Sequence, residues 1–273
     1  MARSPHVSPL LSVVTVNRNM ADGLARTIAS VAQQDFSSYE YIVVDGASTD
    51  DSGNVVGRNS DIIDRWLSEP DSGIYDAMNK GVSLARGEWV LFLNSGDAFA
   101  SNDVLSAVMA AAGPGDDILY GDALMRYPTG ARRVVAAFEP KELPYGMICS
   151  HQALFARREL LEAEPFTVGK IRSDYEFLVR CRTRGRMFHR VPIVVAEVEA
   201  GGLSDRRRIS ALRETAVLLY RGGLFGPRAI LRLGFMFVWT AAGMVVKPLL
   251  PQPIMDAARR YKVAIFGARS ALS

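Results

Sequence analysis

Cysteine is scarce in this chain of 273 residues, which contains only Cys149 and Cys181. Two cysteines are too few for a disulfide framework, and neither belongs to a Cys-x-x-Cys pair, so we expect free thiols in a reducing compartment. No signal peptide is visible, because residues 1–9 are polar and the apolar stretch Leu10–Val16 has only about seven residues. We therefore expect the folded body to be cytoplasmic.

A hydrophobic run of the roughly 20 residues that span a bilayer is also missing from the basic C-terminal part. Leu233–Val246 is uncharged and mostly apolar over fourteen residues, between Arg232 and Lys247. Such a stretch forms either a buried core helix or a helix that lies in the membrane interface. The flanking basic side chains, whose charged heads can reach lipid phosphates, favour the interface. Ile254–Arg269 adds a second basic, amphipathic segment.

Motifs that would assign other chemistries are absent. There is no Gly-x-x-x-x-Gly-Lys-Ser/Thr phosphate loop and no metal-spaced cluster of cysteine and histidine. Internal repeats and low-complexity tracts are absent too. The run Arg206-Arg207-Arg208 lacks the aromatic interleaving typical of nucleic-acid binding, so we expect no nucleic-acid partner.

Charge is distributed unevenly along the chain. Residues 201–273 contain twelve Lys or Arg against three acids, which gives +9, and since the whole chain carries +3, residues 1–200 carry −6. A mildly acidic body with a strongly basic end indicates that the end faces an anionic surface. We therefore expect an α/β domain over residues 1–200 and a basic, apolar helical tail over residues 201–273 that associates with membrane.

Apolar runs alternate with helix-spaced segments along the first half of the chain. The expected strands are 10–16, 39–44, 88–93 and 117–120, and the expected helices are 21–34, 74–86 and 102–112, with another from Asp50 or Asp51 towards Trp66. The second half is less regular, with a hairpin at 123–137, a strand at 151–156, a helix at 173–185 and an extended segment at 187–199. This alternation predicts an α/β fold with a mostly parallel, Rossmann-like sheet flanked by helices.

Polar residues follow three of the expected strands. They are Thr15–Asn19, Asp45 and Asn94–Asp97. Ligands of such sheets bind beyond the carboxyl ends of the strands, so we expect these three segments to converge on one crevice.

Five stretches of this sequence carry a further signal: SVVTVNRN (12–19), TIASVAQQ (27–34), YIVVDGASTD (41–50), GIYDAMNKG (73–81) and ARGEWVLFLNSGD (85–97). Together they resemble the family 2 glycosyltransferases, which have the GT-A nucleotide-sugar fold. GIYDAMNKG followed by LNSGD is similar to members that build bacterial surface polysaccharides. The resemblance implies an inverting transfer from a nucleotide-diphosphate sugar to a saccharide acceptor. A lipid-linked acceptor would explain a tail that binds membrane. We therefore expect the protein to be peripheral on the inner face of the plasma membrane.

The resemblance also implies a divalent cation, Mg²⁺ or Mn²⁺, that neutralises the departing diphosphate. In the family an Asp-x-Asp type motif holds it. Here Asn94-Ser95-Gly96-Asp97 stands where Asp-Ser-Asp-Asp is common. We therefore assign the metal role to Asp97 alone, and to Asn94 a hydrogen-bonding role towards ribose or phosphate.

The other candidates for nucleotide-sugar binding lie at strand ends and on one helix. Thr15 and Asn19 stand where family members contact the base, and Asp45 stands where the family has two adjacent acids. Asp76 and Asn79 are three residues apart, so they share a helix face. The alternative for Asp76 is an ordinary acid in the first turn of a helix, favoured by the helix dipole.

Inverting transfer also requires a base that takes the proton of the acceptor hydroxyl. The family supplies it from a Glu-Asp type motif at the start of a helix, and Ser173-Asp174 stands in that place. Asp174 is therefore the candidate base, unless it merely occupies the first turn of its helix. His151 either faces the acceptor or forms a structural hydrogen bond.

Two other classes of function remain open on the sequence alone. A nucleotidyltransferase has a similar α/β core, but SVVTVNRNMADG (12–23) matches poorly the Gly-rich, Arg/Lys-containing loop expected after its first strand. A non-catalytic, membrane-bound scaffold with a decayed site would explain the missing acids. The sequence leaves open the donor sugar, its nucleotide, the acceptor and the oligomeric state.

Overall fold

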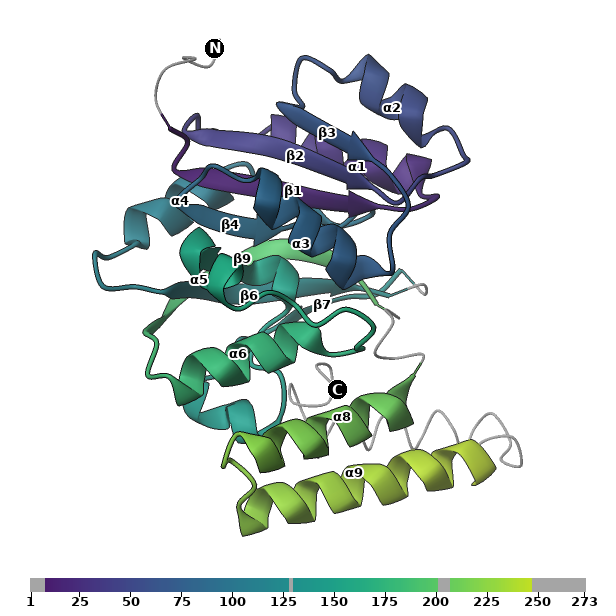
Figure 1. The fold of residues 1–273 in the computed structure, drawn as a ribbon, viewed down its shortest axis with the longest axis vertical. Coiled ribbons are helices and arrows are strands. Elements are labelled where there is room, and N and C mark those ends of the chain that lie inside the picture. The colour runs from purple at the N-terminus through teal and green to yellow at the C-terminus, as the bar shows by residue number, and fades with distance from the viewer. Residues whose placement is uncertain (1–7, 128–129, 201–206, 247–273) are drawn as a thin grey trace. The chain divides into compact units, whose positions relative to one another are not determined.

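The computed structural model describes residues 8–127, 130–200 and 207–246, and these divide into two compact units (Figure 1). The first unit comprises the chain up to Ala137 together with Cys149–Gly169 and Gly185–Ala200. The second comprises Phe138–Ile148, Lys170–Arg184 and the described part of the tail. The helix that carries Asp174 therefore belongs to the same unit as the tail.

Within the described residues, nine strands of the first unit form one mixed sheet in the order β3-β2-β1-β4-β8-β6-β9-β5, with β7 paired to β6. The strands are β1 (Leu11–Asn17), β2 (Tyr39–Asp45), β3 (Arg65–Ser68), β4 (Trp89–Phe92), β5 (Ala98–Phe99), β6 (Ile118–Arg126), β7 (Arg132–Val135), β8 (Leu154–Arg157) and β9 (Phe188–Glu199). Strands β1 to β4 pair in parallel, as the sequence predicts, whereas β8 pairs antiparallel to both β4 and β6.

Helices cover both faces of this sheet (Figure 1). They are α1 (Ala21–Ala32), α2 (Ser52–Arg58), α3 (Ile74–Leu84), α4 (Val104–Ala111) and α5 (Arg158–Ala163). The loop after α1 is tied to the segment before α4 by a 2.9 Å hydrogen bond from the amide of Asp35 to the carbonyl of Asn102. Helix α3 packs against β1 and β2 on the other face, together with α5. Every residue of β1 and β2 is buried as a result, which explains their continuous apolar runs.

Most of the predicted elements are present, and the differences have local causes. The helix expected to run towards Trp66 ends at Arg58, because the polar turn around Asn59 stops it, and Trp66 lies in the edge strand β3 with 49% of its surface exposed. The strand expected from His151 begins at Leu154, after the short 3-10 helix η2 (His151–Ala153). The two-residue strand β5 and the one-and-a-half-turn helix α5 are too short to show a periodicity.

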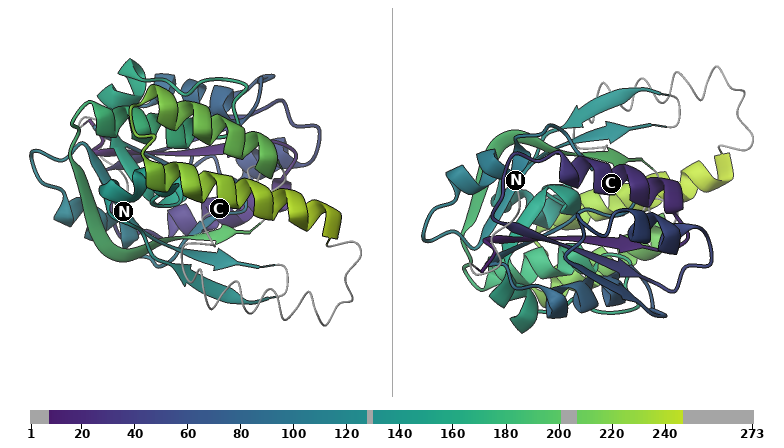
Figure 2. Two further views of the ribbon diagram at one scale, coloured as in Figure 1. Left: turned by 90° about the horizontal axis from the view of Figure 1, so that it is seen from below. Right: turned by 90° about the horizontal axis from the view of Figure 1, so that it is seen from above.

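The second unit is helical. It contains the 3-10 helix η1 (Pro140–Tyr145) and the helices α6 (Ser173–Thr183), α8 (Arg208–Arg221) and α9 (Pro227–Val246). Helices α8 and α9 lie side by side (Figures 1 and 2). The carboxylate of Glu214 on α8 accepts hydrogen bonds from the backbone amides of Ile171 and Arg172, at 3.0 and 3.1 Å, and so anchors the start of α6. Helix α9 includes the predicted helix 233–246. The predicted segment Ile254–Arg269 lies outside the described residues.

Candidate active site

The carboxyl ends of β1, β2 and β4 meet in the first unit, as the sequence predicts. The side-chain amide of Asn17 at the end of β1 donates a 2.7 Å hydrogen bond to Asp45 at the end of β2. The backbone amide of Ser95, just after β4, donates to the carbonyl of Val16 at 3.1 Å. Three parallel strands that end together leave the space beyond their ends for a ligand.

Asp45 organises the turn at the end of β2. Its carboxylate accepts hydrogen bonds from Asn17, from the amide and hydroxyl of Ser48 at 2.9 and 2.5 Å, and from the hydroxyl of Ser68 at 2.8 Å. Burial alone would raise the pKa of Asp45, but these hydrogen bonds outweigh it and hold the pKa below its ordinary value. Asp45 is therefore ionised at neutral pH and holds the ends of β1, β2 and β3 together.

Thr15 and Asn19, the two candidates on β1 and its loop, differ in exposure. Thr15 is fully buried, and its hydroxyl donates to the carbonyl of Leu93 at 2.7 Å. Asn19 is exposed at the rim, with a φ of 51°, and its side-chain oxygen accepts a 2.8 Å hydrogen bond from the amide of Thr49. Contact of either residue with a base stays a prediction, and in this structure only Asn19 is open to a ligand.

Asp97 is held from two sides after β4. One carboxylate oxygen accepts a 2.8 Å hydrogen bond from the side-chain amide of Gln152, and the other accepts a 3.2 Å bond from the backbone amide of Glu199. The residue is only 6% exposed. Burial raises the pKa of Asp97 above its ordinary value, although Gln152, His151, Glu199 and Arg26 all oppose the rise. The sequence places His151-Gln152 before a strand, as a pair that could face the acceptor, but it does not predict the contact of Gln152 with Asp97, which depends on the pairing of β8 with β4.

The side chain of Asn94 contacts His151, the residue before Gln152. Its side-chain nitrogen lies 2.8 Å from Nε2 of His151, which is the structural hydrogen bond that the sequence allowed for this histidine. Its side-chain oxygen is buried and finds no hydrogen-bond donor among the described residues. A buried amide oxygen without a hydrogen-bond donor can accept a hydrogen bond from a ligand or coordinate a cation.

Helix α1 supports the turn that joins Asn94 to Asp97. The hydroxyl of Thr27 accepts a 3.0 Å hydrogen bond from the amide of Gly96 and donates one of 2.7 Å to the carbonyl of Asp97. Arg26 donates to the carbonyl of Gly96. Gly96 itself has a φ of 96°, a backbone angle that glycine adopts far more readily than residues with a Cβ atom. These supporting contacts of α1 are a part of the site that the sequence did not reveal.

The oxygen donors at this turn fit a cation only in part. Asp97 and the free oxygen of Asn94 are hard donors of the kind that Mg²⁺ and Mn²⁺ prefer, but Asp97 is buried and already accepts two hydrogen bonds. Within the described ranges, no group of three or more His, Cys, Asp or Glu side chains could hold a metal ion. The set therefore suits a cation that arrives with a diphosphate rather than one that the protein holds alone.

Asp76 and Asn79 bind neighbouring parts of the chain. Asp76, in the first turn of α3, accepts a 2.9 Å hydrogen bond from the amide of Ser72, as expected of an acid at a helix start. Asn79 exchanges two hydrogen bonds with the backbone of Phe166, at 2.8 and 2.9 Å. Both side chains thus stabilise the loops beside α3, and their contact with a donor stays a prediction.

Asp174, in the second unit, lies in the first turn of α6 and is half-buried. One of its oxygens accepts a 2.8 Å hydrogen bond from the amide of Tyr175. Tyr175 is fully buried below it and donates its hydroxyl hydrogen to the carbonyl of Leu143 in η1. The helix start that carries Asp174 is thereby fixed, which a positioned base requires.

Comparison with known sequences decides the family. The sequence model described as Glycosyl transferase family 2 matches residues 12–163, which include all three strand ends. The chain belongs to glycosyl transferase family 2. A curated relative, a "PGL/p-HBAD biosynthesis glycosyltransferase" of Mycobacterium bovis (strain BCG / Pasteur 1173P2), is 35% identical over an alignment of 210 positions, and the match covers 72% of this chain and 80% of the relative.

Solved structures with the GT-A fold resemble this family 2 glycosyltransferase in fold. The mannosyltransferase PcManGT of Pyrobaculum calidifontis, solved with GDP-Man and Mn²⁺, has a TM-score of 0.64 at 18% identity and covers 98% of this chain and 84% of its own. TarS 1-349 of S. aureus, solved with UDP-GlcNAc, has a TM-score of 0.62 at 18% identity. That match covers 77% of this chain and 66% of the TarS chain, just under two thirds. At these identities the structures support the fold alone.

Proposed function

We propose that this family 2 glycosyltransferase transfers a sugar, with inversion, from a nucleotide-diphosphate donor to a lipid-linked saccharide acceptor in the synthesis of a bacterial surface glycan. The observation that carries the proposal is the meeting of three parallel strand ends, with Asp45, Asn94 and Asp97, beyond which a donor binds. The nucleotide sugars named for the similar structures and the PGL/p-HBAD biosynthesis named for the curated relative support it.

Each part of the site has a role in this proposal. Asn19 at the rim binds the nucleoside, and Asp45 keeps the strand ends in place. Asp97 and the oxygen of Asn94 would hold a divalent cation, Mg²⁺ or Mn²⁺, and such a cation would supply the positive charge that offsets the leaving diphosphate. Asp174 accepts the proton of the acceptor hydroxyl as that oxygen attacks the anomeric carbon from the face opposite the diphosphate.

Donor binding is tested with a panel of UDP, GDP and TDP sugars in a thermal-shift assay on the full-length protein. We expect one nucleotide class to stabilise the protein, by about 2.7 kcal/mol when the ligand is at 100 times its Kd. Mn²⁺ should increase the shift and EDTA should reduce it. We also expect slow donor hydrolysis without acceptor, which a scaffold with a decayed site would not show. Absence of any shift and any hydrolysis would refute the proposed function.

We further propose that helix α9 lies on an anionic membrane surface, with the enzyme on the cytoplasmic side. The outer side of α9 is apolar, and its side chains are 45% to 74% exposed. They are Ile230, Leu231, Phe235, Phe237, Val238 and Trp239. A contiguous apolar surface of this kind marks an interaction site, and nearby basic residues suit anionic lipids. No helix in the described part of the chain is long and apolar enough to cross a membrane.

Vesicle binding tests this placement. The double change Phe235→Ser, Val238→Ser should weaken binding to vesicles containing phosphatidylglycerol by at least tenfold, since burial of each large apolar side chain contributes about 1.5–3 kcal/mol. The matched control is Val134→Ser in β7, which is 48% exposed and belongs to the first unit. Sedimentation with vesicles measures both. Equal binding by the double variant and the control would exclude α9 as the contact.

A further inference from the structure

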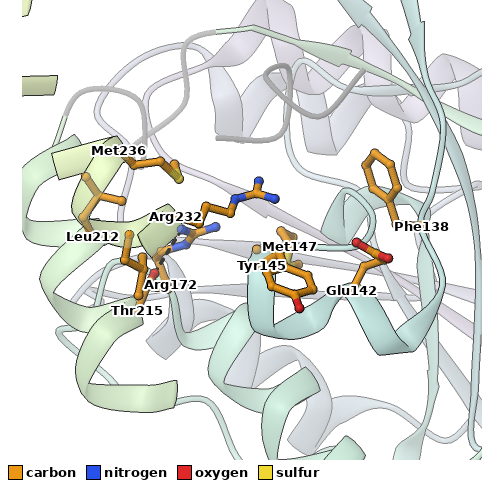
Figure 3. Close-up of a pocket in the computed structure, with 11 residues that line it drawn as sticks. Phe138, Glu142, Tyr145, Met147, Arg172, Leu212, Thr215, Arg232 and Met236 are labelled. Atoms are coloured by element: carbon orange, nitrogen blue, oxygen red, sulfur yellow. Dashed lines mark hydrogen bonds between the residues drawn. The ribbon is translucent and has the colours of Figure 1, made fainter. Parts of the chain in front are cut away.

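The second unit contains an open pocket that the proposed catalytic residues do not line. Its walls come from Phe138, from η1 and the following loop, from the residue before α6, and from α8 and α9 (Figure 3). The pocket is amphipathic: two arginines line its middle, and apolar side chains of α8 and α9 line one side.

The two arginines are Arg172 and Arg232. Arg172 donates one of its hydrogens to the hydroxyl of Thr215 at 3.1 Å, and its guanidinium carbon lies 5.0 Å from the ring centre of Tyr175. The guanidinium carbon of Arg232 lies 6.0 Å from the ring centre of Tyr145. Contact with an aromatic ring helps to orient a guanidinium group, whose N–H donors lie in the plane of the group.

The charges of these two groups converge. Both guanidinium groups line this one pocket, and burial raises the pKa of Tyr175 to about 12 while the charges of Arg172 and Arg232 oppose that rise. The carboxylate of Glu142 also lines the pocket, so the three charged side chains sum to +1. Paired guanidinium groups match the geometry of phosphate oxygens, to which arginine donates two parallel hydrogen bonds.

The apolar wall is formed by Leu212 of α8 with Leu233 and Met236 of α9. Leu233 and Met236 are about half a helix turn away from Phe235 and Val238, so α9 presents apolar side chains both to the pocket and to its outer face. A single ligand that has an anionic group next to an apolar chain would satisfy both parts of this pocket.

We propose that this pocket binds a phosphate ester next to an apolar chain, as at the junction of a lipid-linked acceptor, with Arg172 and Arg232 on the phosphate and Leu212, Leu233 and Met236 on the chain. This inference rests on the proposed function, because it makes the ligand a part of the acceptor. Arg172 stands two residues before Asp174, so a phosphate held here ties the acceptor to the unit that carries the base.

The probe is dodecyl phosphate, used as a monomer in calorimetric titration of the full-length protein. We expect it to bind at least tenfold more tightly than either inorganic phosphate or neutral dodecyl maltoside. Inorganic phosphate that binds equally well would show a free-phosphate site and overturn the proposal. Dodecyl maltoside that binds equally well would show a merely apolar site and overturn it too.

Variants locate the probe in the pocket. Arg232→Gln and Leu233→Ser should each weaken dodecyl phosphate at least tenfold, and Arg232→Lys, which keeps the charge but loses the fork, should weaken it less. The matched control is Arg228→Gln, an exposed arginine one turn earlier on α9. Equal weakening in the control would mean general attraction to the basic surface and would overturn the proposal. The Phe235→Ser, Val238→Ser protein should retain the affinity, since those residues face away from the pocket.

A parallel measurement separates this inference from the proposed function. The thermal shift with the nucleotide-sugar donor is recorded on the same preparations and should be unchanged in Arg232→Gln, which also shows that the variant is folded. Donor binding without dodecyl phosphate binding in the wild-type protein would overturn the pocket assignment alone. Failure of the donor to bind would count against the proposed function.

Discussion

Replacing Asp174 with asparagine is expected to lower the rate of sugar transfer by about 100- to 10,000-fold, the contribution typical of a positioned general base. Asparagine has nearly the same shape but cannot take the proton of the acceptor hydroxyl. The donor affinity should stay within about twofold, because Asp174 acts on the acceptor. Turnover with saturating donor, beside a thermal shift with the same donor, measures both quantities.

The control for Asp174 is a carboxylate in the same kind of position. Glu159 is exposed in the first turn of α5, and Glu159→Gln should leave both transfer and donor affinity unchanged. If Asp174→Asn retained more than about a tenth of the wild-type turnover, well above the range expected for loss of a base, Asp174 would be only an acid that stabilises its helix start.

Asp97→Ala is expected to weaken donor binding in the presence of Mn²⁺ at least tenfold and to remove most of the difference that a chelator makes. The physical reason is that Asp97 is the single carboxylate within Asn94–Asp97, so its loss removes the charged oxygen donor of that segment. The variant should also lose about 2–3 kcal/mol of folding stability, because Gln152 and the amide of Glu199 lose their acceptor.

A second variant separates these two effects. Gln152→Ala removes the hydrogen bond to Asp97 but keeps the carboxylate, so it should reduce the free energy of unfolding while the response to chelator persists. Calorimetric titration of the donor, with Mn²⁺ and with EDTA, gives the comparison for both proteins. A chelator response in Asp97→Ala that equals the wild-type response would remove Asp97 as the metal ligand.

The sequence predicts the central elements of this fold because burial imposes a simple pattern on them. Strands such as β1 and β2 are covered on both faces, so each is a short apolar run with polar residues where it ends. The crossovers between parallel strands then place those ends together, and Asn17 does contact Asp45. Local pattern and general topology were enough to locate the candidate donor site.

Local sequence patterns do not predict the contacts between distant segments of the chain. Asp97 is separated by 55 residues from Gln152 and by 102 from Glu199, and both contacts depend on how β8 and β9 join the sheet. The pattern also gave no sign that Arg172 and Arg232 would line one pocket, since sixty residues separate them and each resembles an ordinary surface charge. Pairing that is set by tertiary packing leaves no local trace in composition or periodicity.

The backbone at Gly96 limits how the lost acids of this site can return. At a φ of 96° an aspartate would be strained by about 1–3 kcal/mol, and its Cβ would lie 3.1 Å from the terminal carbon of Met20. An aspartate at the third position of the family motif would therefore cost stability, most of it from the backbone angle, since the end of the Met20 side chain can move. Position 94 has no such barrier, and an aspartate there would face His151. An acid is thus easier to accommodate at position 94 than at position 96, where the backbone opposes it.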